Sequence, residues 1–134
     1  MDAPTVADEP MMTLRLALRR NDVGQTPFRN RTEVPFEGTA TSPHWEGTWR
    51  VSGIDHITRG TRGTSSLDVH TVITNGDETV LYHAIGRGGP DGILEGVVFE
   101  TSNERLAWLN EAVAVGRAEL DGAELAIELF QITT

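Results

Sequence analysis

The sequence predicts a mainly β fold: a single antiparallel β-barrel with one short helix near residues 103–110. Apolar and polar residues alternate with period two in several segments, which is typical of strands with one buried face. The chain has 14 Gly and 6 Pro, and turn signals recur at spacings of roughly 8–15 residues. A chain of 134 residues has room for one domain, and closing its sheet into a barrel leaves no long open edges.

The first elements follow from composition and alternation. Residues 1–10 contain two prolines and three acidic residues, so we expect a disordered acidic leader, followed by one barrel domain over residues 11–134. Residues 12–19 alternate and predict the first strand. Residues 44–51 predict a second strand, in which Trp45 and Trp49 share one side.

A hairpin is the strongest local prediction. Residues 66–74 and 79–87 read as strands on either side of Asn75-Gly76-Asp77, and Asn-Gly tolerates the backbone angles of a tight turn. Residues 92–101 predict another strand, whose Val97-Val98-Phe99 run indicates burial on both faces.

The remaining elements complete the barrel. Ser102 or Asn103 can cap the predicted helix, which carries Leu106 and Leu109 inward. The last two strands, 112–120 and 124–132, are separated by the turn signal Asp121-Gly122. The general shape expected is that of lipocalins and streptavidin.

Composition excludes several classes of function. The chain has 20 acidic and 11 basic residues and a net charge of −9, so we expect neither nucleic acid nor a membrane surface as partner. All basic residues are Arg and Cys is absent, which excludes lysine and thiolate catalysis and cysteine-bound metals. The chain has no apolar run of membrane-spanning length, and we expect a cytoplasmic protein.

Asp55 and His56 are the first candidate catalytic residues. They lie within a predicted glycine-containing loop, residues 53–60, and loops at a barrel rim often carry reactive groups. An aspartate after glycine can equally serve as a turn former.

Asp68, His70 and His83 are the other catalytic candidates. Asp68 and His70 share one face of a predicted strand, where a carboxylate can orient an imidazole; the alternative is that this face is the solvated outer wall. Counting outward from the turn pairs His70 with His83, to within one residue. A site of two histidines and one carboxylate is conceivable there, but we predict no metal ion.

Aromatic residues are the candidate ligand-binding groups, since they supply rigid apolar area to a pocket. The alternative is ordinary core packing. The residues are Trp45, Trp49, Tyr82 and Trp108.

Several segments resemble the DUF3237 (UPF0311) family. The string FETSNERLAWLN at residues 99–110, followed by Ala114-Val115-Gly116, is the most specific. Val34-Pro35-Phe36-Glu37-Gly38, Ser52-Gly53-Ile54-Asp55-His56 and Leu67-Asp68-Val69-His70-Thr71 resemble further family segments in the same order. The resemblance implies a small antiparallel barrel, often a homodimer, with a ligand-sized cavity, and it places Asp55 on the motif aspartate. The chain departs from the pattern at Ser52, His56 and His70.

Three possibilities remain open. The first is a cofactor-independent enzyme, an isomerase, dehydratase or cyclase, which acts on a small apolar or aromatic metabolite by Asp/His proton transfer or by pocket shape. The second is a non-catalytic carrier of such a metabolite. The third is a dimerising structural module without a ligand, whose lumen is filled by side chains. Flavin, nicotinamide and nucleophile signatures are absent, so no cofactor is expected.

Overall fold

The structure is a computed structural model that describes residues 2–19, 21–25 and 30–134. Its elements are almost entirely strands, as predicted. They are β1 (Thr5–Val6), β2 (Met12–Leu18), β3 (Asn21–Gln25), β4 (Asn30–Thr41), β5 (Trp49–Arg59), β6 (Ser65–Asn75), β7 (Glu78–Gly89), β8 (Gly92–Thr101), β9 (Val113–Asp121) and β10 (Glu124–Thr133), with the 3-10 helices η1 (Thr61–Gly63) and η2 (Glu104–Glu111).

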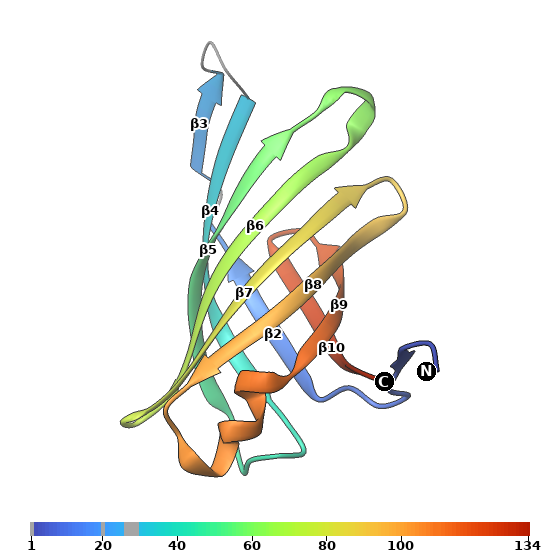
Figure 1. Cartoon of the computed structure of the whole chain (residues 1–134). Coiled ribbons are helices and arrows are strands. Elements are labelled where there is room, and N and C mark those ends of the chain that lie inside the picture. Colours follow the sequence, from blue (N-terminus) through green and yellow to red (C-terminus); the bar gives the residue numbers. More distant parts are fainter. Residues whose placement is uncertain (1, 20, 26–29) are drawn as a thin grey trace.

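Antiparallel pairing closes the sheet into a barrel (Figure 1). Around the wall, β2 is followed by β4, β5, β6, β7, β8, β9 and β10, and β10 pairs back onto β2. The predicted mainly β fold, a single antiparallel barrel with one short helix near residues 103–110, is therefore confirmed, and η2 is that helix. Strand β3 lies off this path and pairs only with β4 among the described strands.

The predicted hairpin and its register are confirmed. Asn75 pairs with Glu78 and His70 pairs with His83, so the two central turn residues are Gly76 and Asp77. Gly76 has φ +62°, a left-handed conformation that glycine adopts without steric cost.

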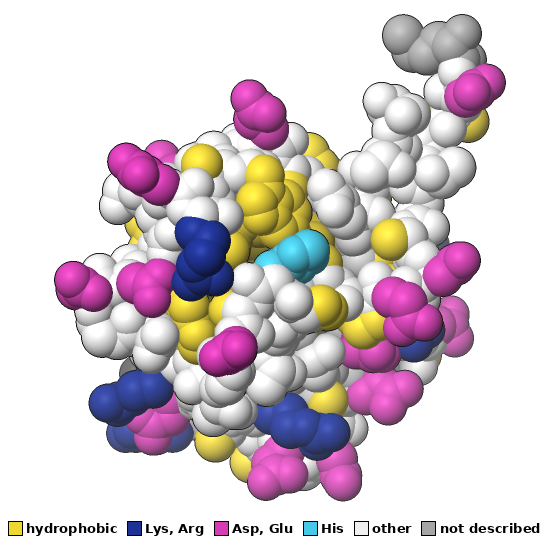
Figure 2. All heavy atoms as spheres, turned by 90° about the horizontal axis from the view of Figure 1, so that it is seen from below, with side chains coloured by type: hydrophobic (Ala, Val, Ile, Leu, Met, Phe, Trp, Pro, Cys, Tyr) yellow, Lys and Arg dark blue, Asp and Glu magenta, His cyan; other side chains and the backbone are white. Residues whose placement is uncertain are grey.

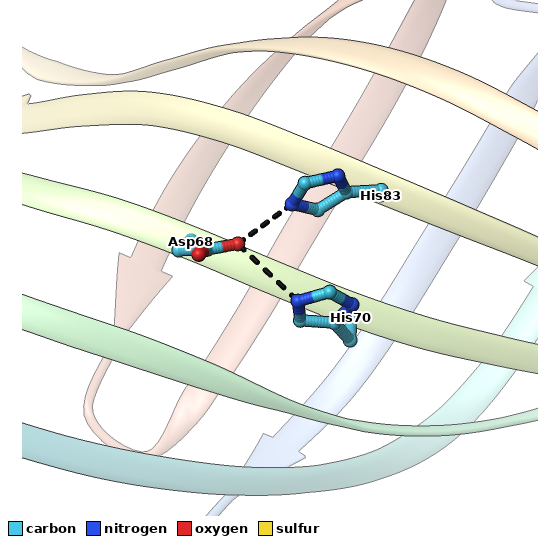
Figure 3. A group of neighbouring side chains, drawn as sticks. All are labelled: Asp68, His70 and His83. Atoms are coloured by element: carbon cyan, nitrogen blue, oxygen red, sulfur yellow. Dashed lines mark hydrogen bonds and ion pairs between the residues drawn. The ribbon is translucent and has the colours of Figure 1, made fainter.

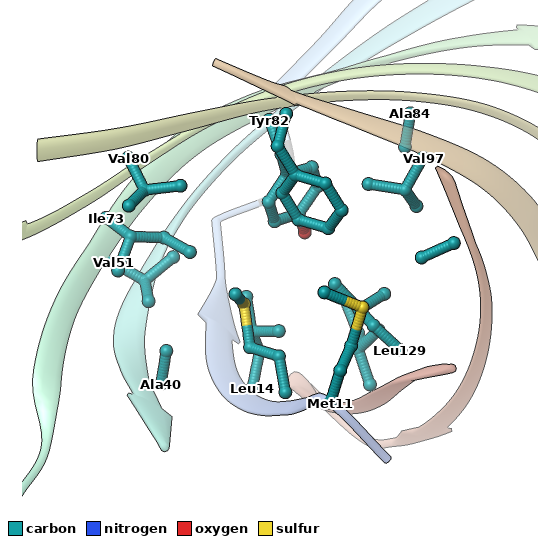
Figure 4. Packing of buried hydrophobic residues seen from close by; sticks show 14 of the residues in the cluster. Met11, Leu14, Ala40, Val51, Ile73, Val80, Tyr82, Ala84, Val97 and Leu129 are labelled. Atoms are coloured by element: carbon teal, nitrogen blue, oxygen red, sulfur yellow. The ribbon is translucent and has the colours of Figure 1, made fainter. Parts of the chain in front are cut away.

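Alternation along the strands separates a lumen face from an outer face. Part of the lumen is packed with apolar side chains, some of which Figure 4 shows, and Leu14, Ile73 and Leu129 among them are fully buried. Burying each such side chain contributes about 1.5–3 kcal/mol. This packed core fixes the strands that also form the wall of the unfilled part of the lumen.

The two ends of the barrel differ. At the closed end, η2 and the segment between β4 and β5 cover the core with Leu106, Leu109 and Trp45. Figure 2 views the molecule from this end: hydrophobic side chains reach its centre and acidic side chains are scattered around it. The open end carries the turns between β5 and β6, β7 and β8, and β9 and β10 (Figure 1). Among the described residues, no helix has both the length and the apolar character needed to cross a membrane.

Three local predictions differ from the structure. Within the expected disordered leader, whose Met1 lies outside the described residues, Thr5–Val6 form β1 and pair with β10, because β10 extends past the end of β2 and offers free backbone groups. The second strand begins at Trp49 instead of residue 44. Val98 is 51% exposed, because neighbouring residues of this strand face opposite sides of the barrel wall.

The predicted loop over residues 53–60 is also wrong, since β5 continues to Arg59. Gly53 serves packing here. A Cβ atom at this position would lie 2.6 Å from Cζ of Phe36, so only glycine leaves room for that ring. Asp55 and His56 are consequently consecutive strand residues that point to opposite sides of the wall.

Candidate functional site

A cavity of about 570 Å³ occupies the lumen toward the open end. Glycine and alanine lie at many of its wall positions, including Gly88, Ala118 and Ala123, and this leaves the space that larger side chains fill in the packed part. Leu16, Phe36, Leu67 and Ile127 make most of the remaining wall apolar. An eight-stranded barrel is just wide enough to hold one small ligand in this way.

Asp55 lies in the wall of this cavity. It occupies a lumen position of β5, paired with Val34 of β4 and Val69 of β6. Both valines line the same cavity, so the carboxyl group has apolar neighbours on either side. Its Oδ1 atom is buried and has no hydrogen-bond partner among the described residues.

Glu95 lies in the same cavity, on β8. It is only 6% exposed, and its cross-strand partners are Gly86 of β7 and Gly116 of β9. A Cβ atom at residue 116 would lie 3.1 Å from Glu95 Oε1, and one at residue 86 would lie 2.8 Å from Glu95 Cβ. The two glycines thus make room for the glutamate, whose Oε1 is buried without a hydrogen-bond partner in the described part of the chain.

Burial dominates the electrostatics of both acids, because an apolar environment disfavours the charged form. It raises the pKa of Asp55 to about 7, although a hydrogen bond from the backbone of Asp68 opposes the shift. Burial, together with the negative charge of Asp55, raises the pKa of Glu95 to about 7. The two carboxyl groups therefore titrate near neutral pH and influence each other.

Glu95 is the residue that the sequence analysis missed. The sequence does indicate that Glu95 is buried, because alternation along the predicted strand over residues 92–101 puts it on the same face as Val97 and Phe99. A carboxylate among the buried positions of an apolar strand is rare unless it is paired or functional.

The aromatic candidates lie outside the described cavity wall. Trp45 and Trp49 stack at the closed end, with ring centroids 4.4 Å apart, and Trp108 packs against the core beside His44. Tyr82 is buried in the core, where burial and the charge of Glu95 hold its pKa above the usual value. These four residues support the barrel below the cavity.

The histidine candidates lie on the outer wall. Asp68, His70 and His83 project together from β6 and β7, as Figure 3 shows. Asp68 Oδ1 lies 2.7 Å from Nε2 of His83 and 3.4 Å from Nε2 of His70. The bond to His83 lowers the pKa of Asp68 below its ordinary value. The structure thus brings these three residues together but separates them from Asp55.

His56 also faces outward, on β5. Its Nδ1 lies 2.6 Å from a guanidinium nitrogen of Arg31, and because arginine can only donate, this ring nitrogen accepts. Glu33 lies 3.4 Å from both groups. His56 is therefore part of a polar cluster on the outer wall and not a partner of Asp55.

Fold and site together define a class: small closed β-barrels with a ligand-sized, mainly apolar cavity. The chain belongs to the DUF3237 family, described as proteins of unknown function, whose model matches residues 7–87. This range contains the family-like segments around Asp55 and Asp68, whereas the FETSNERLAWLN string lies beyond it. No curated protein matches the chain in sequence.

Solved structures from several organisms are similar to this chain in fold. A β-barrel-like protein from Acinetobacter baumannii is similar with a TM-score of 0.84 at 18% identity, covering 99% of this chain and 98% of that one. A conserved protein of unknown function from Rhodopseudomonas palustris has a TM-score of 0.81 at 17% identity, covering 98% and 100%. An enzyme from Penicillium herquei has a TM-score of 0.73 at 23% identity, covering 99% and 97%. These likenesses establish the fold.

Proposed function

We propose that the protein is a cofactor-independent enzyme that moves protons on a small, largely apolar metabolite held in the barrel lumen. The observation that carries the proposal is the pair Asp55 and Glu95, two carboxyl groups in one mainly apolar cavity, each with a buried oxygen that has no hydrogen-bond partner among the described residues. Isomerisation, dehydration and cyclisation are the reactions in reach, because each can proceed by proton donation and removal alone.

The two acids have distinct roles in this proposal. Near neutral pH, a negative charge on Asp55 favours the protonated form of Glu95. Asp55 is then the general base and Glu95 the general acid. A pair of carboxyl groups with pKa values near the working pH is suited to this task, since one accepts a proton while the other supplies one.

The cavity wall defines the substrate class. Its apolar side chains favour hydrocarbon or aromatic surface, and the two carboxyl groups supply polar contacts within it. Arg59 lines the cavity close to the end of β5, where its guanidinium can meet an anionic or carbonyl oxygen of the substrate. The substrate proposed is therefore a small molecule with an apolar body and at least one oxygen function.

The proposed reaction does not use the polar residues on the outer wall, because the barrel wall separates them from the cavity. These residues are His56, Asp68, His70 and His83.

A carrier that binds such a metabolite without changing it is the second candidate. The mainly apolar wall of the cavity favours this candidate, because a carrier needs only a lined cavity.

The test uses the small-molecule extract of the organism that encodes the protein, incubated in D₂O buffer and followed by mass spectrometry. The wild type is expected to convert a compound or to load it with deuterium. Asp55→Asn and Glu95→Gln should each slow this by about 10²–10⁴-fold. Glu100→Gln is the matched control, because Glu100 is exposed on the same strand as Glu95. A compound that is retained by the protein but never altered would establish the carrier and overturn the enzyme.

A further inference from the structure

We propose that Asp68, His70 and His83 form a divalent transition-metal site on the outer wall of the barrel. The proposal does not depend on the lumen chemistry. It concerns a different face of the sheet and a different set of side chains.

The geometry brings three potential metal ligands close together. One potential ligand atom from each residue lies within 4.8 Å of the other two. Nε2 of both histidines approaches the same carboxylate oxygen, Asp68 Oδ1, and the imidazole rings stack with centroids 4.5 Å apart and planes 13° apart (Figure 3).

Metal bonds of 2.0–2.1 Å place tetrahedral ligand atoms about 3.3 Å apart. The 3.4 Å separation of Asp68 Oδ1 and His70 Nε2 already has this length. The 2.7 Å separation of Asp68 Oδ1 and His83 Nε2 must open by about 0.6 Å. The two imidazole rings are nearly parallel, so they must also rotate before both Nε2 lone pairs point at one ion. All three side chains are partly exposed, which allows these rotations without moving the strands.

The backbone holds the three residues in place. His70 and His83 are direct cross-strand partners in the β6–β7 hairpin, and Asp68 lies two residues from His70 on the same face. Ligands on paired strands keep a fixed separation, so less conformational entropy is lost when a metal ion binds.

The ligand set indicates the kind of ion. Two neutral imidazoles and one carboxylate suit Zn²⁺ and the neighbouring divalent transition metals, whereas Ca²⁺ and Mg²⁺ prefer oxygen ligands. The net charge of −9 also attracts cations. Three protein ligands leave a coordination position open to water, on a wall groove of about 480 Å³ that both histidines line.

The experiment is a calorimetric titration of the full chain with ZnCl₂ at pH 7.5, together with Co²⁺ absorption spectra. We expect one ion per chain, weaker binding at pH 5.5 because protons compete with metal ions for their ligands, and cobalt bands typical of four ligands. His70→Ala and His83→Ala should each weaken binding at least 10-fold.

His44→Ala is the matched control, because His44 packs against Trp108 at the closed end, away from the cluster. It should leave the affinity unchanged. The proposal is overturned if the wild type binds no Zn²⁺ at millimolar concentration, or if His70→Ala and His83→Ala, shown to be folded by circular dichroism, bind it as the wild type does. Loss of binding in His44→Ala alone would likewise contradict it.

Discussion

Asp55 on β5 and Glu95 on β8 project from strands three places apart in the barrel wall into one apolar cavity. The charge of Asp55 raises the pKa of Glu95 through this space. Neither buried oxygen, Asp55 Oδ1 or Glu95 Oε1, has a hydrogen-bond partner among the described residues. A buried carboxyl oxygen without a hydrogen-bond partner costs stability, so two of them in one cavity are better explained by function than by stability.

The first prediction concerns stability and pH. The folded pKa values of Asp55 and Glu95 lie above their ordinary values of 3.8 and 4.5, near 7, so between about pH 4 and 7 the folded chain binds more protons than the unfolded chain. The free energy of unfolding should therefore fall as pH rises through this range, by up to about 3–4 kcal/mol per group. Urea denaturation at pH 5 and pH 8 measures the difference in the free energy of unfolding.

The matched variant for that measurement is Asp55→Asn/Glu95→Gln. Neutral amides do not titrate, so the double variant should lose most of the decrease between pH 5 and 8. Equal pH dependence in the wild type and in the double variant would show that the two acids titrate normally.

The second prediction concerns the space beside Glu95. In Gly116→Ala, the new Cβ atom would lie 2.8 Å from Leu129 Cδ2 and 3.1 Å from Glu95 Oε1. We expect a loss of about 1–3 kcal/mol in the free energy of unfolding and displacement of the glutamate, seen as a changed carboxyl pKa. Gly96→Ala is the control, since a Cβ atom there meets no atom within 4 Å. If the two variants behave alike, Gly116 has no special role.

The third prediction concerns access to the cavity. Gly88 lies in the cavity wall, and a Cβ atom at this position makes only ordinary contacts of 3.7 and 3.9 Å. Gly88→Leu should therefore fold normally and fill part of the cavity. We expect it to weaken binding of an apolar fluorescent probe at least 10-fold, whereas Gly96→Leu on the outer wall should not. Unchanged probe affinity in Gly88→Leu would place the binding site elsewhere.

The fold was largely predictable because alternation and turn chemistry are local properties. The His70–His83 register followed from the Gly76-Asp77 turn alone. The strand over residues 53–59 was missed because Gly53 resembles a loop residue, and its role became visible only once Phe36 was placed against it from another strand. The homodimer that the family resemblance implies stays a prediction, and light scattering would test it.

The site was less predictable, because whether a side chain faces the lumen or the outer surface depends on the phase of its strand. The sequence analysis predicted a loop over residues 53–60 where β5 continues. Asp55 and His56 were therefore assigned to one site, although they lie on opposite sides of the wall. The lumen position of Glu95 could be predicted from the alternation of its own strand alone. Its relation to Asp55 depends on barrel closure, which brings β5 and β8 around one lumen and cannot be read from either segment.

The most direct test of the central claim is a ¹³C NMR titration of the side-chain carboxyl groups, assigned with Asp55→Asn and Glu95→Gln. The account predicts that the Asp55 and Glu95 signals titrate near pH 7, and that removing Asp55 lowers the pKa of Glu95. Titration of both groups near pH 4, as in exposed acids, would contradict it.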